Sequence, residues 1–334
     1  MEINDLKIQQ GILHILDMNN GLPLLSDQGL EIEADTFDFL YAHVLNILEE
    51  LDLRELTLVN DENAIWQQVK SLNDENFVQV SKEICQIIFD YQITQPMIPS
   101  GDFLLLEMLL NDKEYLGLLK FEYKESYIHY VDQTELGINN KIICQRVSLP
   151  GLKQKAVEAF FMEKEGNRLL IKDKKYEING EKKAYLSEIL LEAETAFSVK
   201  EKLNKYEKTM KNFVKKYCDD DLEVIQKVKT EMVKQADEKG EISFDEVVDE
   251  VFFENTELKN LCHEELIKKG IEDTKVEATE KVQKNITKKH RIVIDNGIEV
   301  KLPIEYMDRA DKIEIINQPD GSISFVIKNI ESIK

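Results

Sequence analysis

The sequence predicts an α+β protein with an N-terminal antiparallel sheet and helices, a helical middle and a small C-terminal β-hairpin module. Two mostly apolar runs, 103–110 and 115–123, flank a polar turn, which is typical of a β-hairpin. Apolar residues recur at helical spacing through 200–217, and a period of two returns after residue 290. A chain of 334 residues usually holds two or three domains. We expect three modules, which span residues 1–183, 184–286 and 287–334.

The N-terminal segment begins with an expected strand and two expected helices. Residues 6–16 mix apolar side chains with Gln and Gly, which favours an opening or edge strand. One helix opens at Asp35 and a second follows Asn76, and each carries one apolar face. Trp66 lies between them, and we interpret it as part of the core rather than as a platform for a ligand.

The central hairpin is expected near the middle of the sheet. In its second strand Lys120 and Glu122 alternate with apolar residues, which predicts that this end of the strand turns one face to water. Residues 126–131 and 141–149 indicate two more strands. Pro150 suits the first turn of a helix, so we expect a helix from there to Lys164.

The middle of the chain has strong helical signals. Residues 200–217 place apolar side chains on one face and lysines on the other, and the acids at 219–221 are expected to cap a helix that runs to about Glu238. Residues 235–246 have the length and the glycine of a calcium-binding loop. Gln235 and Lys239 stand where the ion requires anionic oxygens, so we expect an ordinary connection between two helices.

Two hairpins are expected at the C-terminal end. The dipeptide Asn296-Gly297 suits a type I′ turn between residues 291–294 and 298–302. Pro319, Asp320 and Gly321 form a second turn between two more alternating runs.

The charge of the chain is unevenly distributed. The formal net charge is −22, and residues 1–60 hold twelve acids against two basic residues. Residues 199–217 hold seven lysines against two acids, and residues 281–291 hold five basic residues and no acid. An acidic body therefore carries two local basic surfaces, which could bind phosphates even though the whole chain repels them.

No motif for catalysis or for a resident cofactor stands out. The chain lacks a Walker A loop, GxGxxG, GxSxG and HExxH, and its four cysteines include no CxxC pair. We therefore expect no metal, no cofactor and no enzymatic activity, with a hydrolase hidden in the fold as the minor alternative. The apolar runs are too short to cross a membrane and no signal peptide opens the chain, so we expect a cytoplasmic protein without membrane association.

The order of the motifs resembles the bacterial nucleoid-associated protein family known as NdpA or YejK-like. The resemblance lies in the strands 101–110 and 115–123, the basic run before Phe160-Phe161-Met162, the connection Gly240-Glu241-Ile242 and the two C-terminal turns. It implies a protein of the cytoplasm and nucleoid that associates with the bacterial chromosome and has no known reaction. It leaves open whether the chain forms an oligomer. Because lysine binds phosphate as a point charge, we expect a largely sequence-independent association with double-stranded DNA, or an association with DNA-processing machinery.

Lysines are the residues expected to touch DNA. Three groups are candidates, and the last is carried over from the resemblance: Lys205, Lys208, Lys211, Lys215 and Lys216; Lys284, Lys288, Lys289 and Arg291; and Lys153 and Lys155. The acidity of the chain favours an alternative, in which it is a protein–protein adaptor or a DNA mimic that recruits basic DNA-processing proteins without binding DNA itself.

Overall fold

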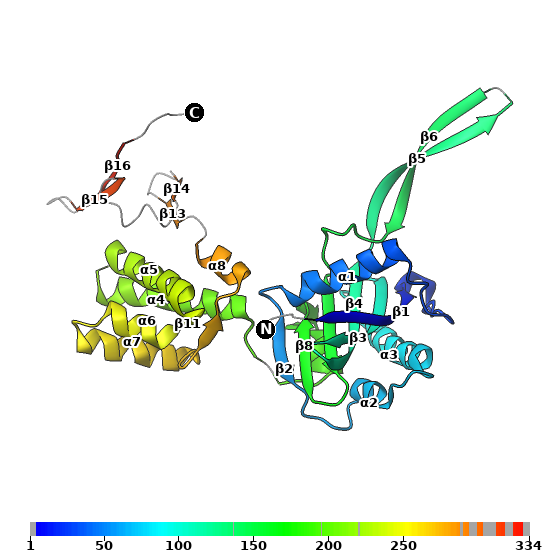
Figure 1. Ribbon diagram of the computed structural model, residues 1–334, viewed down its shortest axis with the longest axis horizontal. Helices are drawn as coiled ribbons and strands as arrows, with labels where there is room; N and C mark the ends of the chain where they lie inside the picture. Colours follow the sequence, from blue (N-terminus) through cyan, green and yellow to red (C-terminus); the bar gives the residue numbers. More distant parts are fainter. Residues whose placement is uncertain are drawn as a thin grey trace. The chain divides into compact units, whose positions relative to one another are not determined.

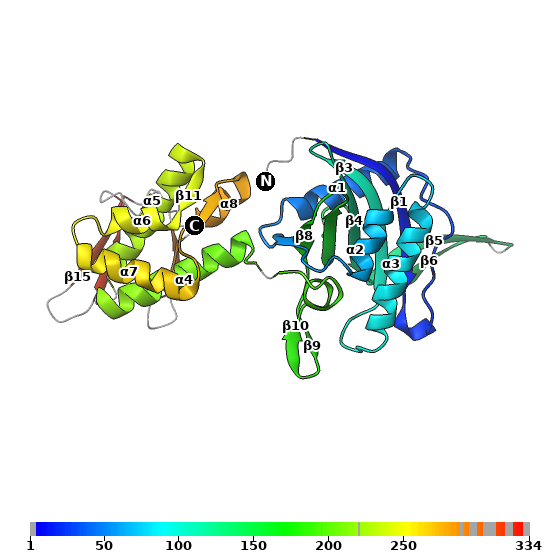
Figure 2. The same ribbon diagram turned by 90° about the horizontal axis from the view of Figure 1, so that it is seen from below.

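The chain divides into two compact units, Met1–Ser198 and Val199–Lys334 (Figures 1 and 2). The computed structural model describes residues 5–135, 137–194, 196–219, 221–287, 290–293, 299–302, 312–317 and 323–329. The predicted α+β class is confirmed. The division into three modules stays a prediction.

A six-stranded antiparallel sheet forms the centre of the first unit, in the spatial order β1–β3–β4–β7–β8–β2. Its strands are β1 (Leu6–Leu16), β2 (Arg54–Thr57), β3 (Gly101–Leu110), β4 (Lys113–Glu122), β7 (Glu158–Glu163) and β8 (Arg168–Lys172). The predicted edge strand β1 and central hairpin β3–β4 are confirmed. Asn111 and Asp112 join the hairpin with φ of 50° and 63°, as a type I′ turn requires.

Helices cover both faces of this sheet. Helix α1 (Ala34–Leu48) packs on one face, and α2 (Ala64–Ser71) and α3 (Phe77–Gln92) pack on the other. Because successive strand residues point to opposite faces, Leu104 joins the cluster under α1 while Leu105 joins the cluster under α2 and α3. The central strands are therefore continuous apolar runs, as expected of strands buried on both sides.

The helices of the first unit largely match the sequence. Helices α1 and α3 are confirmed, and Trp66 is buried in the core as predicted. Helix α2, which contains Trp66, was not predicted, because its eight residues are too few for a clear helical period. Asn63 caps it, since its side chain accepts a hydrogen bond from the backbone N–H of Trp66 at 3.1 Å.

The helix predicted from Pro150 to Lys164 is wrong. Residues 158–163 form strand β7, which lies between β4 and β8 and is buried along its whole length. A short apolar run has no period that separates a buried strand from a buried helix, so the neighbouring strands decide.

The two strands predicted around residues 126–131 and 141–149 are confirmed, but they do not join the sheet. They form β5 (Lys124–Thr134) and β6 (Gly137–Ser148), which pair only with each other among the described strands. This hairpin extends from the body of the first unit (Figure 1). The unit also holds the smaller elements Met18–Asn20 (a 3₁₀ helix), β9 (Tyr176–Ile178), β10 (Glu181–Lys183) and Tyr185–Leu190 (a π-helix).

The second unit is mainly helical. Its helices are α4 (Val199–Tyr217), α5 (Leu222–Lys239), α6 (Phe244–Val251), α7 (Thr256–Lys269) and α8 (Glu280–Ile286). The predicted cap of α5 is confirmed, since the Asp221 carboxylate accepts a hydrogen bond from the N–H of Glu223. The ring of Tyr206 on α4 stacks on that of Phe244 on α6, with centroids 4.2 Å apart.

The connection between α5 and α6 contains a short strand. β11 (Glu241–Ser243) pairs with β12 (Lys275–Glu277), and Ile242 lies opposite Val276. Glu246, the residue that would close a calcium loop, instead pairs with Lys239 at 2.6 Å.

Both C-terminal hairpins are confirmed in their strands. They are β13 (His290–Val293) with β14 (Glu299–Leu302), and β15 (Ile313–Asn317) with β16 (Ile323–Ile327). The turns predicted at Asn296-Gly297 and at 319–321 lie outside the described residues.

His14 makes the stability of the first unit depend on pH. Its Nδ1 accepts the N–H of Ser26 at 3.0 Å and its Nε2 donates to the hydroxyl of Ser81 at 2.9 Å, so both ring nitrogens serve the neutral form. Burial, with a smaller effect from Lys82, lowers the pKa of His14 to about 4. The unfolded chain, with a histidine pKa of about 6.5, therefore binds a proton first as the pH falls.

We expect the free energy of unfolding to decrease between about pH 6.5 and pH 4 because of His14. The His14→Gln variant lacks this titration, so urea unfolding of both proteins across that range isolates it. The stability advantage of the wild type should shrink as the pH falls. A constant difference from pH 7 to pH 4 would contradict the assignment.

Candidate nucleic-acid interface

The two units differ in net charge. Residues 1–198 hold 18 basic residues against 35 acids, a net of −17, whereas residues 199–334 hold 25 against 30, a net of −5. Phosphate backbones are repelled by the first unit far more than by the second. A basic surface is therefore most effective on the second unit.

Helix α4 carries an exposed row of lysines. Lys208, Lys211 and Lys215 follow one another at i, i+3 and i+7, which places them on one side of the helix. We call these three residues the lysine stripe. Their side chains are exposed, and no acid among the described residues forms an ion pair with them. The opposite side of α4 packs into the core through Leu203, Tyr206, Met210, Phe213 and Val214.

The other two candidate lysines of α4 lie beside the stripe. Lys205 is half-buried and has contacts of its own. Lys216 is exposed with its Nζ 4.6 Å from the ring centroid of Tyr217, and a hydrogen bond to that side chain raises the pKa of Lys216. On α5, burial lowers the pKa of Lys229; the charge of Glu207 counteracts this, and the charge of Lys211 adds to it.

The second candidate group is described only in part. Lys284 on α8 pairs with Glu280 one turn earlier, which neutralises its charge locally. Lys288 and Lys289 lie outside the described residues. The backbone of Arg291 belongs to β13, where it pairs in register with Lys301 of β14.

The third candidate group lies on the acidic first unit. Lys153 is exposed, but Lys155 forms an ion pair with Glu50. Glu50 also lies 3.9 Å from Lys172. This carboxylate is about 100 residues away in sequence, so the pairing has no local signal. It leaves Lys155 less available for a phosphate.

A cluster of buried polar residues was missed by the sequence analysis. Lys120 was predicted to face water, but its side chain is fully buried and its Nζ lies 2.9 Å from Oε2 of Glu158 on the neighbouring strand. The hydroxyls of Tyr176 and Tyr185 donate to the same oxygen at 3.1 and 3.4 Å. The strand alternates as predicted, but the rings of Tyr176 and Tyr185 cover Lys120 on the face that was expected to be wet. The Lys120–Glu158 pair has no access to solvent, so its role is structural.

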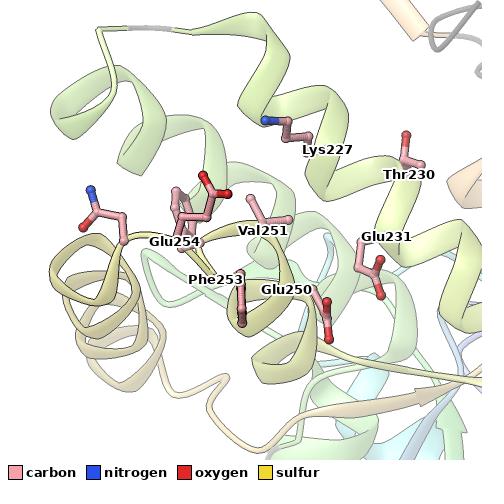
Figure 3. Close-up of a pocket in the computed structure, with 9 residues that line it drawn as sticks. Lys227, Thr230, Glu231, Glu250, Val251, Phe253 and Glu254 are labelled. Atoms are coloured by element: carbon pink, nitrogen blue, oxygen red, sulfur yellow. The ribbon is translucent and has the colours of Figure 1, made fainter.

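A pocket of about 580 Å³ lies in the second unit between α5 and the end of α6 (Figure 3). It is lined by Lys227, Thr230, Glu231, Glu250, Val251, Phe252, Phe253, Glu254 and Asn255. Three acids outnumber its one lysine, so the pocket does not suit a phosphate group. The lining offers no histidine, cysteine or serine. Within the described residues, no group of three His, Cys, Asp or Glu side chains could hold a metal ion.

No helix in the described part of the chain is long and apolar enough to cross a membrane. A search of curated proteins finds no similar sequence. The family model described as nucleoid-associated protein YejK matches residues 12–334. This confirms the predicted resemblance and the predicted location at the nucleoid, in the cytoplasm. Because the match extends over almost the whole sequence, the chain belongs to the YejK family of nucleoid-associated proteins.

Proposed function

We propose that this protein associates with bacterial double-stranded DNA through its second unit, without regard to sequence and without catalysing a reaction. The lysine stripe is the observation that carries the proposal, because it is an exposed basic row with no acid paired to it among the described residues. The family is named for its place at the nucleoid and not for a reaction.

The chemistry of the stripe suits the phosphate backbone. Lysine binds phosphate as a point charge, so it fixes the protein on the duplex but reads no bases. At about 1.5 Å per residue, the stripe runs roughly 10 Å along α4. Three phosphate contacts would give a slope of about −2.7 in log K against log salt. Contacts from Lys205 and Lys216 would bring the slope to about −4.5, with affinity near or weaker than about micromolar at physiological salt.

We expect Lys208→Gln, Lys211→Gln and Lys215→Gln together to flatten this slope by about 2 to 3 units. The measurement is the affinity for a random-sequence duplex at several salt concentrations, by fluorescence anisotropy. A matched control removes three exposed lysines of the same unit that already pair with acids: Lys234 (with Glu231), Lys268 (with Glu265) and Lys275 (with Glu241). Both triple variants change the net charge equally, so only a contact effect separates them.

The same assay decides between the lysine groups. If the stripe variant and its control bind alike, the contact lies elsewhere, and Lys288, Lys289 and Arg291 are the next set to neutralise. If neither set changes the slope, the site assignment is wrong although the family stands.

The charge of the first unit supports a second candidate function. Its net charge of −17 suits an adaptor that binds basic DNA-processing proteins or mimics DNA towards them. A pull-down from nuclease-treated lysate separates the two functions. Partners kept without DNA favour the adaptor, and partners lost with the DNA favour direct DNA binding. Wild-type protein with no salt-dependent DNA binding would leave the adaptor as the function.

A further inference from the structure

The connection between α5 and α6 has the spacing of a calcium-binding loop. A twelve-residue loop of that kind has carboxylates or amides at positions 1, 3 and 5, glycine at position 6 and glutamate at position 12. Counted from Gln235, this chain places Asp237, Gly240 and Glu246 at positions 3, 6 and 12. The pattern fails at position 1, which is Gln235, and at position 5, which is Lys239. Two side chains therefore separate this segment from the complete pattern.

The backbone of this segment also has the form of a calcium-binding loop. We call residues 235–246 the loop. Gly240 has a φ of 69°, and a left-handed glycine makes the sharp turn that position 6 requires. The side chain of Gln235 is buried, and its Oε1 accepts the N–H of Ser243 at 3.0 Å, so position 1 already points into the loop. The scaffold of a cation site is therefore present.

A second helix–loop–helix, formed by α7, β12 and α8, pairs with the first. Strands β11 and β12 are antiparallel, and Ile242 lies opposite Val276. Ile242 stands four residues before Glu246, and Val276 stands four residues before Glu280, so both glutamates close their loops at the same position. The second loop has a lysine and an isoleucine at positions 1 and 3, so the first loop is the one that nearly completes the pattern.

Lys239 fills the place that an ion would take in the first loop. Positions 5 and 12 both contact the ion in a calcium-binding loop, and here Nζ of Lys239 lies 2.6 Å from Oε2 of Glu246. The hydrogen bond between these side chains is the main cause that raises the pKa of Lys239 and lowers the pKa of Glu246. An ammonium group thus balances the carboxylate that would otherwise bind a divalent ion.

The two helix–loop–helix halves together hold α4 by its apolar face. The ring of Phe213 lies 5.5 Å from that of Phe252, which follows α6, and Sδ of Met210 lies 3.6 Å from Sγ of Cys262 on α7. Calcium sensors bind a basic amphipathic helix in this manner after calcium opens their apolar groove. Here the helix belongs to the same chain and already contacts both halves.

We propose that the loop is a calcium-type loop with a built-in cation, in which Lys239 takes the place of calcium. The second unit then holds α4 without a metal ion, and the position of the lysine stripe does not depend on the calcium concentration. This consequence for the stripe rests on the proposed function. The cation site itself is tested without DNA, so its failure and the failure of DNA binding are distinguishable.

Gln235→Asp together with Lys239→Asp completes the pattern, and we call this variant the converted chain. Calorimetric titration of the full-length protein with calcium should give one ion per converted chain, with a Kd on the order of 10 μM, as in sensor loops. The wild type should bind no calcium up to about 1 mM. Gln235→Asp alone is the matched control, because it adds a ligand but keeps the ammonium group, and it should also bind none.

Far-UV circular dichroism follows the folding of the converted chain. Its four loop carboxylates repel one another without a cation, so any helix lost in the absence of calcium should return when calcium is added. Adding Glu246→Gln removes the ligand at position 12 and should abolish calcium binding. Calcium binding by the wild type or by Gln235→Asp alone overturns the proposal, and so does a converted chain that binds no calcium at 1 mM.

Discussion

Replacing Glu158 by Gln is expected to lower the free energy of unfolding of the first unit by about 3–5 kcal/mol. Both charged side chains of the Lys120–Glu158 pair are fully buried, with 2.9 Å between Nζ and Oε2. Burial lowers the pKa of Lys120, and the carboxylate beside it counteracts this. Without the carboxylate, the ammonium group is either charged and unpaired or must lose its proton, and both states cost stability.

Trp66 allows the free energy of unfolding of the first unit to be measured separately, because it is the one tryptophan of the sequence and lies in the core of that unit. Urea unfolding followed by its fluorescence gives the free energy. Glu122→Gln is the matched control, since Glu122 forms a partly exposed pair with Lys174 at 3.1 Å and should cost less than about 1 kcal/mol. Adding Lys120→Met to Glu158→Gln removes the unpaired charge and should restore part of the loss. Equal effects of the two Gln variants would show that the buried pair is dispensable.

The elements predicted correctly are those whose signal lies within one segment. Helices α1, α3 and α4 each show an apolar stripe at helical spacing, and that stripe packs inward in the structure, while α5 was predicted from its acidic cap. The hairpin β3–β4 has its own turn residues, Asn111 and Asp112. Such signals need no knowledge of the rest of the fold.

The features that the sequence did not reveal depend on distant partners. Lys120 alternates with apolar residues as a solvent-facing residue would, but Tyr176 and Tyr185, which come much later in the chain, cover it and Glu158 supplies its counter-charge. The strands of the β5–β6 hairpin were predicted correctly, but nothing in residues 124–148 shows that these strands leave the sheet. A strand that joins the sheet and one that leaves it can have the same local pattern.

The same distinction between local and distant signals applies to the candidate DNA-binding lysines. The lysine stripe was predictable, because lysines that recur at helical spacing must lie together on the side of the helix opposite its apolar face. The pairing of Lys155 with Glu50 was not predictable, because the two residues lie far apart in the sequence of the first unit. Local periodicity therefore identifies which lysines share a surface. Only the fold shows which of these lysines are neutralised by a nearby acid.

A second large effect on stability is expected in β7, residues 158–163, where the sequence had predicted a helix. Phe160 and Phe161 are both fully buried, but Phe160 belongs to the cluster under α2 and α3 and Phe161 to the cluster under α1. We expect Phe160→Ala and Phe161→Ala each to lower the free energy of unfolding by about 3–5 kcal/mol, because each leaves a cavity in a closely packed layer. Phe37→Ala is the control, since Phe37 lies partly exposed on α1 and should cost much less.

The fluorescence of the folded proteins separates strand from helix. Trp66 lies in the same cluster as Phe160, and the sheet separates it from Phe161. Phe160→Ala should therefore shift the native emission of Trp66, and Phe161→Ala should leave it unchanged although both variants lose similar stability. In a helix the two rings would stand about 100° apart and share one buried side, so both or neither would affect Trp66. An identical shift in both variants would contradict the strand and the two-layered core that it divides.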